Sequence, residues 1–186
     1  RADLREVPGA VRSLGLIDIR SVYDFDGTAS VDIAALADPA QTTAAQRQAR
    51  FLFSDRAELE GQPLVKMHAA TIPARDGQGL VVYYSLPPGS DPAGTGRPDR
   101  PVPMVFTPHG GPWGRDVWGY NPWHQWLANR GYAVLAVNFR ASTGFGKAFT
   151  NAGDHQWGGV VMEDQIDAVR WAITQGIADP HKVAVM

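Results

Sequence analysis

The stretch that decides the fold is Phe106-Thr107-Pro108-His109-Gly110-Gly111-Pro112-Trp113. An apolar run over residues 102–106 leads into it, and a helical pattern opens soon after it at Asn121-Pro122. Two glycines and two prolines within five residues neither continue a strand nor begin a helix. We therefore expect a tight loop whose backbone N–H groups can face a cleft with no side chain in the way.

Strand and helix patterns alternate from this loop onward. A first helix is expected from N-cap Asn121 and Pro122 to Gly131, followed by an apolar strand over 132–139. A second helix is expected over about 161–175, and a last strand over 182–186 after the Asp179-Pro180 turn. The apolar stripe of the second helix is predicted to be Met162, Ile166, Val169 and Ile173. This alternation implies right-handed crossovers and a parallel sheet, hence an α/β fold.

Two further strands are expected before the loop. Residues 68–74 and 80–86 alternate in the manner of strands around Arg75-Asp76-Gly77, which predicts a hairpin. Residues 86–101 are rich in proline and glycine and predict an exposed connection. The hairpin would give the parallel sheet an antiparallel start.

Residues 1–66 carry weaker patterns. Short strands are expected at 14–19, 21–25, 30–36 and 49–54, separated by turn residues such as Asp26-Gly27. Their spacing suggests an antiparallel blade or the edge of a sandwich, but no clean internal repeat identifies a propeller. We divide the chain into 1–66, terminal strands or a linker, and 67–186, an α/β domain.

Composition narrows the functional classes. Of 186 residues, 44% are hydrophobic and 19% charged, as in a globular protein, and the net charge of −2 gives no reason to expect nucleic acid or an anionic membrane as a partner. No run approaches the roughly 18 apolar residues that span a bilayer. The N-terminus has no signal-peptide pattern, and the absence of cysteine leaves both cytoplasm and periplasm open. The chain opens on Arg1 without a methionine and closes on a strand pattern, so we expect both ends to be cut.

The order of the strands gives the loop a chemical interpretation. In α/β-hydrolases the third strand runs into a glycine-rich loop that donates an N–H to an oxyanion, and the fifth runs into the nucleophile elbow, Gly-x-Ser-x-Gly. Here the strands at 68–74, 80–86, 102–106, 132–139 and 182–186 place residues 109–112 after the third. The fifth strand ends the chain. The loop is therefore expected to be one half of an oxyanion hole.

Five segments carry a resemblance to a known family: 109–113 (His-Gly-Gly-Pro-Trp), 118–122, 127–135, 138–146 and 178–185. Together they resemble the catalytic domain of the prolyl oligopeptidase family, in its acylaminoacyl-peptidase and dipeptidyl-aminopeptidase branch. The resemblance covers about 51–186 and is densest from 104. It implies a serine hydrolase domain preceded by a β-propeller, of which residues 1 to about 60 would be the last portion.

The resemblance assigns few site residues. Gly111, with Gly110 beside it, matches the backbone donors to the oxyanion. The Ser, Asp and His of the triad are expected after Met186, so the chain of 1–186 alone is expected to be inactive. Ala141 departs from the glycine that the family usually has after the arginine, which affects the expected shape of the 140–146 loop.

Other conspicuous residues have simpler interpretations. His109 is expected to be a hydrogen-bonded structural residue, because the triad histidine of this fold follows the serine. Ser142 lacks the glycine two residues before it, so it makes a poor elbow. Trp113, near Trp118, Tyr120 and Trp123, either fills a core or borders the substrate pocket.

Charged residues also have structural interpretations. Arg140 is expected to form a structural ion pair with Glu163 or Asp164 rather than to clamp a substrate. The histidines show no metal-binding spacing, so neither a metal nor a cofactor is expected.

The resemblance implies a serine-type peptidase that hydrolyses peptide or acyl-peptide bonds in the intact protein. An esterase on the same scaffold and a catalytically silent chain stay open as alternatives, because a fold does not fix a substrate. The expected partner is a peptide substrate, and both a monomer and a homo-oligomer are open for the intact protein.

Overall fold

A computed structural model describes residues 57–186. The chain divides into two compact units, Arg1–Pro63 and Leu64–Met186. The described part of the first unit contains a 3₁₀ turn, η5 (Ala57–Leu59). The strands expected between residues 14 and 54, and the propeller interpretation with them, lie outside the described residues.

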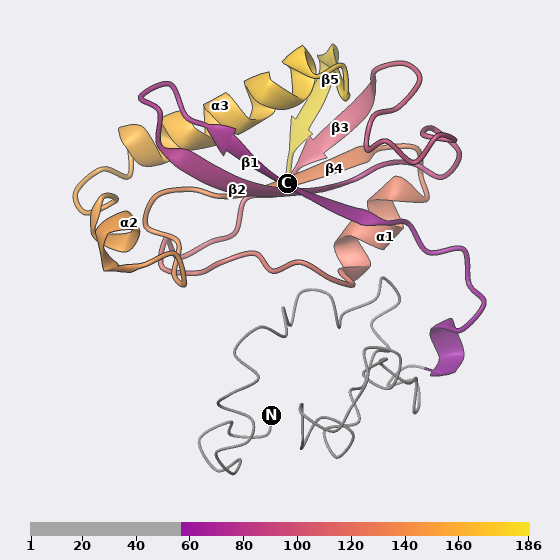
Figure 1. Cartoon of the computed structure of the whole chain (residues 1–186), viewed down its shortest axis with the longest axis horizontal. Helices are drawn as coiled ribbons and strands as arrows, with labels where there is room; N and C mark the ends of the chain where they lie inside the picture. The colour runs from indigo at the N-terminus through magenta and orange to yellow at the C-terminus, as the bar shows by residue number, and fades with distance from the viewer. Residues whose placement is uncertain (1–56) are drawn as a thin grey trace, which may run out of the picture. The chain divides into compact units, whose positions relative to one another are not determined.

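The second unit is built on a five-stranded mixed sheet (Figure 1). The strand order is β1-β2-β4-β3-β5; β1–β2 and β2–β4 are antiparallel, and β3 is parallel to both β4 and β5. The five strands and the hairpin of the sequence prediction are confirmed, and so is the α/β fold. The strands are β1 (Met67–Pro73), β2 (Gly79–Ser85), β3 (Val102–Phe106), β4 (Ala133–Asn138) and β5 (Ala178–Val185).

Two of the helices, α1 (Pro122–Ala128) and α3 (Val160–Thr174), lie on opposite faces of the sheet (Figure 1). Neighbouring residues of one strand point to opposite faces, so Val105 packs with Leu127 of α1 while Phe106 joins the core that includes Ala168 of α3. The chain crosses from β3 to β4 through α1 and from β4 back past β3 to β5 through α3. The carboxyl end of β3 is therefore a topological switch point, where open α/β sheets bind their ligands.

The predicted start of the first helix is confirmed. The side chain of Asn121 accepts hydrogen bonds from the backbone N–H of Trp123 and of His124, and Pro122 occupies the first helical position. A short helix that the sequence pattern did not indicate, α2 (Lys147–Asn151), lies between β4 and α3. At five residues it is too short to show a helical period.

The predicted apolar stripe of α3 is partly wrong. Met162 and Ile166 are 48% and 40% exposed, while Val169 and Ile173 pack beside the core. Small side chains let the helix approach the sheet closely, and a carboxylate can be buried where an arginine pairs with it. The face toward the sheet consists of Val161, Asp164, Ala168 and Ala172.

β5 begins four residues earlier than predicted. Val102 pairs with Ala178, but Met104 pairs with Val183, so the register shifts between these two positions. The extra residues of β5 contain the predicted Asp179-Pro180 turn, in which the carboxylate of Asp179 accepts a hydrogen bond from the backbone N–H of His181. The predicted Asp179-Pro180 turn is therefore an irregularity within β5, at the place where its register against β3 shifts.

Ala141, directly after Arg140, has a left-handed backbone with φ 86° and is buried. Glycine reaches such a conformation at little cost, which is the physical reason that glycine suits this position. Across from it, a Cβ built on Gly153 would lie 2.4 Å from the Ala141 Cβ. Gly153 is therefore needed for a close approach of two backbones.

A buried hydrogen bond links β2 to α1. Ser85 Oγ and His124 Nδ1 are 3.1 Å apart, and both residues are buried. Burial lowers the pKa of His124 to about 4, because a charged imidazole loses its hydration there. No carboxylate is bonded to this pair among the described residues, so it acts as a structural cross-link.

We predict that Gly153→Ala lowers the free energy of unfolding by about 1–3 kcal/mol, since the new methyl group overpacks against Ala141. In an Ala141→Gly background the closest contact is gone, and the penalty should shrink by about 1 kcal/mol. Urea unfolding of the four proteins measures both values. Gly158→Ala is the control, because no atom lies within 4 Å of a Cβ at Gly158. Equal penalties in both backgrounds would contradict the contact.

We predict that the protein loses stability as pH falls from about 6.5 to about 4. The unfolded state binds a proton at His124 near pH 6.5, whereas the folded state resists protonation down to about pH 4. The loss due to this residue should approach about 3 kcal/mol. Urea unfolding at several pH values checks it, with His124→Asn as the comparison. An unchanged pH dependence in that variant would refute the assignment.

Candidate active site

The loop after β3 presents two exposed glycines at the switch point. Thr107 begins the loop with its N–H bonded to Leu135 O, at 2.8 Å. Gly111 has φ +101°, but a Cβ there would meet no atom closer than 3.7 Å. Conformation rather than space therefore requires glycine at 111. Gly110 has no positive φ, and a Cβ there would meet nothing within 4 Å.

His109 holds the base of this loop. Its ring stacks on Phe139, with 4.3 Å between ring centroids. Nδ1 lies 3.1 Å from Gly110 O, and Nε2 lies 2.8 Å from Ser142 Oγ. A carbonyl oxygen only accepts, so the proton belongs on Nδ1, and in the neutral ring Nε2 accepts from the Ser142 hydroxyl. The expectation that His109 is a hydrogen-bonded residue is confirmed.

Ser142 is fully buried and its hydroxyl is used by His109. It also bonds the Phe139 carbonyl through its own backbone N–H, at 2.9 Å. A hydroxyl enclosed in this way cannot reach a substrate carbonyl. The rejection of Ser142 as an elbow serine agrees with this geometry.

A second contact ties the same two loops together. The N–H of Thr143 donates to Gly114 O at 2.9 Å. A Cβ on Gly114 would lie 2.9 Å from Gly110 O and 3.1 Å from His109 Nδ1. The Thr143–Gly114 hydrogen bond therefore joins the loop after β4 to the loop after β3, and glycine at 114 lets the loop after β3 fold closely on itself.

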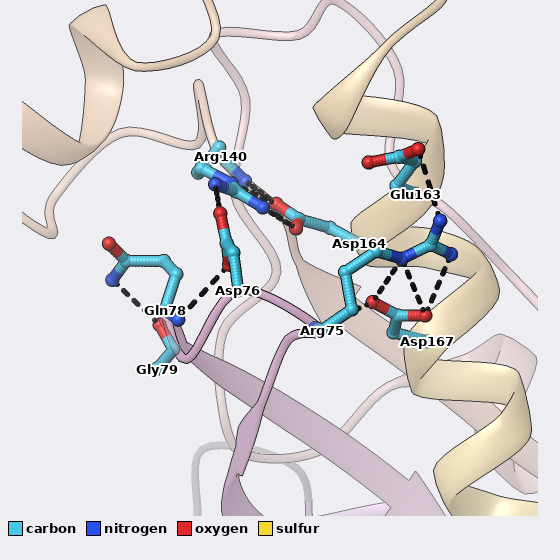
Figure 2. Close-up of polar contacts among 8 residues, drawn as sticks. All are labelled: Arg75, Asp76, Gln78, Gly79, Arg140, Glu163, Asp164 and Asp167. Carbon is cyan, nitrogen blue, oxygen red and sulfur yellow. Dashed lines mark hydrogen bonds and ion pairs between the residues drawn. The ribbon is translucent and has the colours of Figure 1, made fainter.

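Arg140 anchors the second loop through a buried ion pair (Figure 2). Its backbone N–H and its Nε both donate to Asp164 Oδ2 at 2.9 Å, and Nη1 pairs with Asp76 of the β1–β2 hairpin. The hydrogen bond between Arg140 and Asp164 raises the pKa of Arg140. The hydrogen bond that Arg140 donates to Asp76 lowers the pKa of Asp76. The expected pair with Asp164 is confirmed.

The alternative pairing of Arg140 with Glu163 is wrong. Glu163 projects from α3 toward Arg75 and pairs with it at 3.0 Å (Figure 2). Arg75 also binds Asp167, whose pKa is lowered by that hydrogen bond. Helical geometry explains the choice, because successive residues of α3 point in directions about 100° apart, so that Asp164 faces the sheet and the adjacent Glu163 does not.

Asp116 is a site residue that the sequence pattern did not indicate. Its backbone N–H donates to Asn138 Oδ1, and Asn138 Nδ2 donates back to Asp116 O. Its Oδ2 is buried with no hydrogen-bond partner among the described residues. Burial raises the pKa of this carboxyl, and the nearby His109 opposes the rise. Nothing in the spacing of an isolated Asp reveals such burial.

Trp113 lies at the end of the loop, beside an open pocket of about 470 Å³. The rings of Trp113 and Trp157 lie edge to face, with 5.7 Å between their centroids, and both residues are 56% exposed. Two of the aromatic residues named with Trp113 have contacts with other elements: the Trp118 indole N–H donates to Met67 O, and Trp123 contacts Trp126 on α1. The pocket is lined by Trp113, Asp154, His155, Trp157 and Gly158.

The end of β5 meets the start of the glycine loop. The N–H of Met186 donates to Phe106 O at 3.0 Å. A group carried just past β5 would therefore lie beside residues 107–111. Within residues 57–186, no cluster of side chains could hold a metal ion, and no helix is both long and apolar enough to cross a membrane.

Known proteins resemble this chain in sequence and in fold. The family model "Prolyl oligopeptidase family" matches residues 118–186. Dipeptidyl aminopeptidase BIII of Pseudoxanthomonas mexicana is 55% identical over 135 residues, 73% of this chain and 20% of that protein. The chain spans about a fifth of the length of the curated relatives it matches.

Solved structures share the fold. A puromycin-hydrolyzing peptidase of Mycobacterium tuberculosis matches with a TM-score of 0.62 and 30% identity, over 74% of this chain and 21% of that one. The acylaminoacyl peptidase of Pyrococcus horikoshii matches with a TM-score of 0.62 over 74% of this chain and 22% of that one, and at 18% identity it supports the fold alone. With its strand order and the glycine loop after β3, the chain belongs to the prolyl oligopeptidase family.

Proposed function

We propose that the intact protein is a serine peptidase that hydrolyses peptide or acyl-peptide bonds, and that this chain supplies half of its oxyanion hole. The observation that carries the proposal is Gly111, exposed at the switch point in a backbone conformation that only glycine adopts easily. Family membership supports the reaction class.

The proposed mechanism uses residues from both parts of the intact protein. A serine after β5 attacks the substrate carbonyl while a histidine takes its proton and an aspartate orients that histidine. The backbone N–H of Gly111, with Gly110 beside it, and the N–H after the serine stabilise the oxyanion of the tetrahedral intermediate. The contact between Met186 N and Phe106 O supports this arrangement, because it brings the end of β5 to the loop.

The second loop has a positioning role in this proposal. Ser142 holds His109, which in turn contacts Gly110 O, so the path of the backbone before Gly111 is set by two hydrogen bonds. The Arg140–Asp164 pair fixes the loop from which Ser142 projects. Such support keeps the N–H group aimed before the substrate binds, which is the source of oxyanion-hole catalysis.

The direct test is hydrolysis by the purified intact protein. We expect turnover of dipeptidyl or acyl-aminoacyl p-nitroanilides that phenylmethylsulfonyl fluoride abolishes, with the added mass on one serine after Met186. The 1–186 chain, which contains no Gly-x-Ser-x-Gly segment, is the negative control. Ester cleavage without amide cleavage would indicate an esterase, and no labelled serine would indicate a silent protein.

We predict that Gly111→Ala lowers kcat/KM of the intact protein by about 10²-fold or more. A methyl group at φ +101° forces the backbone to rotate, which turns the N–H away from the oxyanion. Steady-state kinetics with a p-nitroanilide measures the loss, and a thermal unfolding curve checks the fold.

Gly110→Ala is the matched control for this prediction. Its backbone needs no left-handed conformation, and its new methyl group meets no atom of the described chain. It should leave kcat/KM little changed. Wild-type activity in Gly111→Ala would remove the Gly111 N–H from the mechanism.

A further inference from the structure

The pocket beside the glycine loop is built by two separate segments. Trp113 comes from the loop after β3, and its partner Trp157 comes from the connection between α2 and α3. Tryptophan side chains are highly buried on average, yet Trp113 and Trp157 each keep more than half of their surface exposed. An open pair of indoles therefore offers surface to a ligand.

The wall that carries Trp157 has a defined shape. Asp154 N–H donates to Asn151 O at 3.0 Å, and Gln156 N–H donates to Gly153 O at 3.1 Å. His155 between them has a left-handed backbone, φ 59°, which is uncommon outside glycine and gathers at functional sites. The opposite wall is held by the Thr143–Gly114 hydrogen bond one residue after Trp113. The pocket is preformed.

The chemistry of the lining favours a cation. Indole faces attract a positive charge through the ring quadrupole, and they also bury the apolar stem of a long side chain. Asp154 adds a carboxylate, whereas no lysine or arginine lines the pocket. A volume of about 470 Å³ lies in the range of small-ligand sites.

We propose that Trp113, Trp157 and Asp154 form a subsite that binds the cationic side chain of a lysine or arginine in the peptide substrate. This inference rests on the proposed function, because the peptide reaches the pocket from the oxyanion loop. Trp113 is two residues from Gly111, so their Cα atoms are at most about 7 Å apart. A residue close to the cleaved bond is therefore within reach of the indoles.

The test compares lysine with norleucine, which has a similar chain without the charge. Hexapeptides carrying one or the other at each position around the cleaved bond are given to the intact protein at pH 8. At one position lysine should raise kcat/KM by about tenfold over norleucine. Asp154→Asn and Trp157→Ala should each reduce this ratio to near one. Trp157→Ala should also lower kcat/KM for the norleucine peptide, because its apolar stem loses the indole it packs on.

Trp126→Ala is the matched control, since Trp126 is an exposed tryptophan on α1 outside the pocket. It should keep the full preference for lysine. Equal cleavage of both peptides at every position overturns the proposal, as does a preference that survives both pocket variants. A Trp157→Ala protein with a lowered Tm and an unchanged ratio would assign the indole pair a packing role instead.

A binding measurement tests the lysine subsite separately from the proposed peptidase activity. Calorimetric titration of the intact protein, treated with phenylmethylsulfonyl fluoride, with the same lysine and norleucine peptides should give tighter binding of lysine, lost in Asp154→Asn. Lysine-selective binding by a protein that cleaves nothing would sink the peptidase and support the subsite. Cleavage of both peptides without selective binding of lysine would support the peptidase and overturn the subsite.

Discussion

The buried ion pair between Arg140 and Asp164 is the interaction on which the loops at the carboxyl ends of β3 and β4 depend. Three elements meet at it: the end of β4, the inner face of α3 and, through Asp76, the β1–β2 hairpin. Burying both charges costs hydration, and only several hydrogen bonds in good geometry offset that cost. Removing either partner would leave the other charge buried alone, a loss of about 3–5 kcal/mol in comparable pairs.

The ion pair also fixes the position of the glycine loop, through a short series of contacts. Arg140 fixes the start of a loop whose next residue, Ala141, has an unfavourable backbone, and the residue after that bonds His109. The loop after β3 therefore takes its shape from residues of β4 and α3 as much as from its own glycines. This explains why a Gly-Gly pair by itself says little about function, whereas its place in the sheet says much.

Much of the fold could be predicted from local patterns. The β3 run, the Asn121-Pro122 helix start and the nearly all-apolar β4 are each recognised from residues that are adjacent in sequence, and the structure confirms all three. The inner face of α3 could not be predicted in this way, because Asp164 is buried only by virtue of a partner far along the chain. The wall opposite Trp113 in the pocket could not be predicted either, because it comes from a connection with no periodicity.

The position of the glycine loop was the most predictable feature of the site. The hydrogen bonds that hold the loop were the least predictable. Strand counting placed residues 109–112 after β3, and the structure has them there. The hydrogen bonds from Ser142 and Thr143 join residues about thirty positions apart, so no window of sequence contains both partners. The unpartnered oxygen of Asp116 is also a property of packing, not of spacing.

The strand order also has a consequence for how the domain folds. Among the described strands, only β1 and β2 pair across a short turn; β2 pairs with β4, and β3 pairs with β5 across α1, β4, α2 and α3. Contacts between distant segments form slowly, because the entropy of closing a long loop is lost before the contact is gained. The loop after β3 follows a strand that lies between β4 and β5 in the sheet. Its final shape is therefore coupled to the completion of the sheet, late in folding.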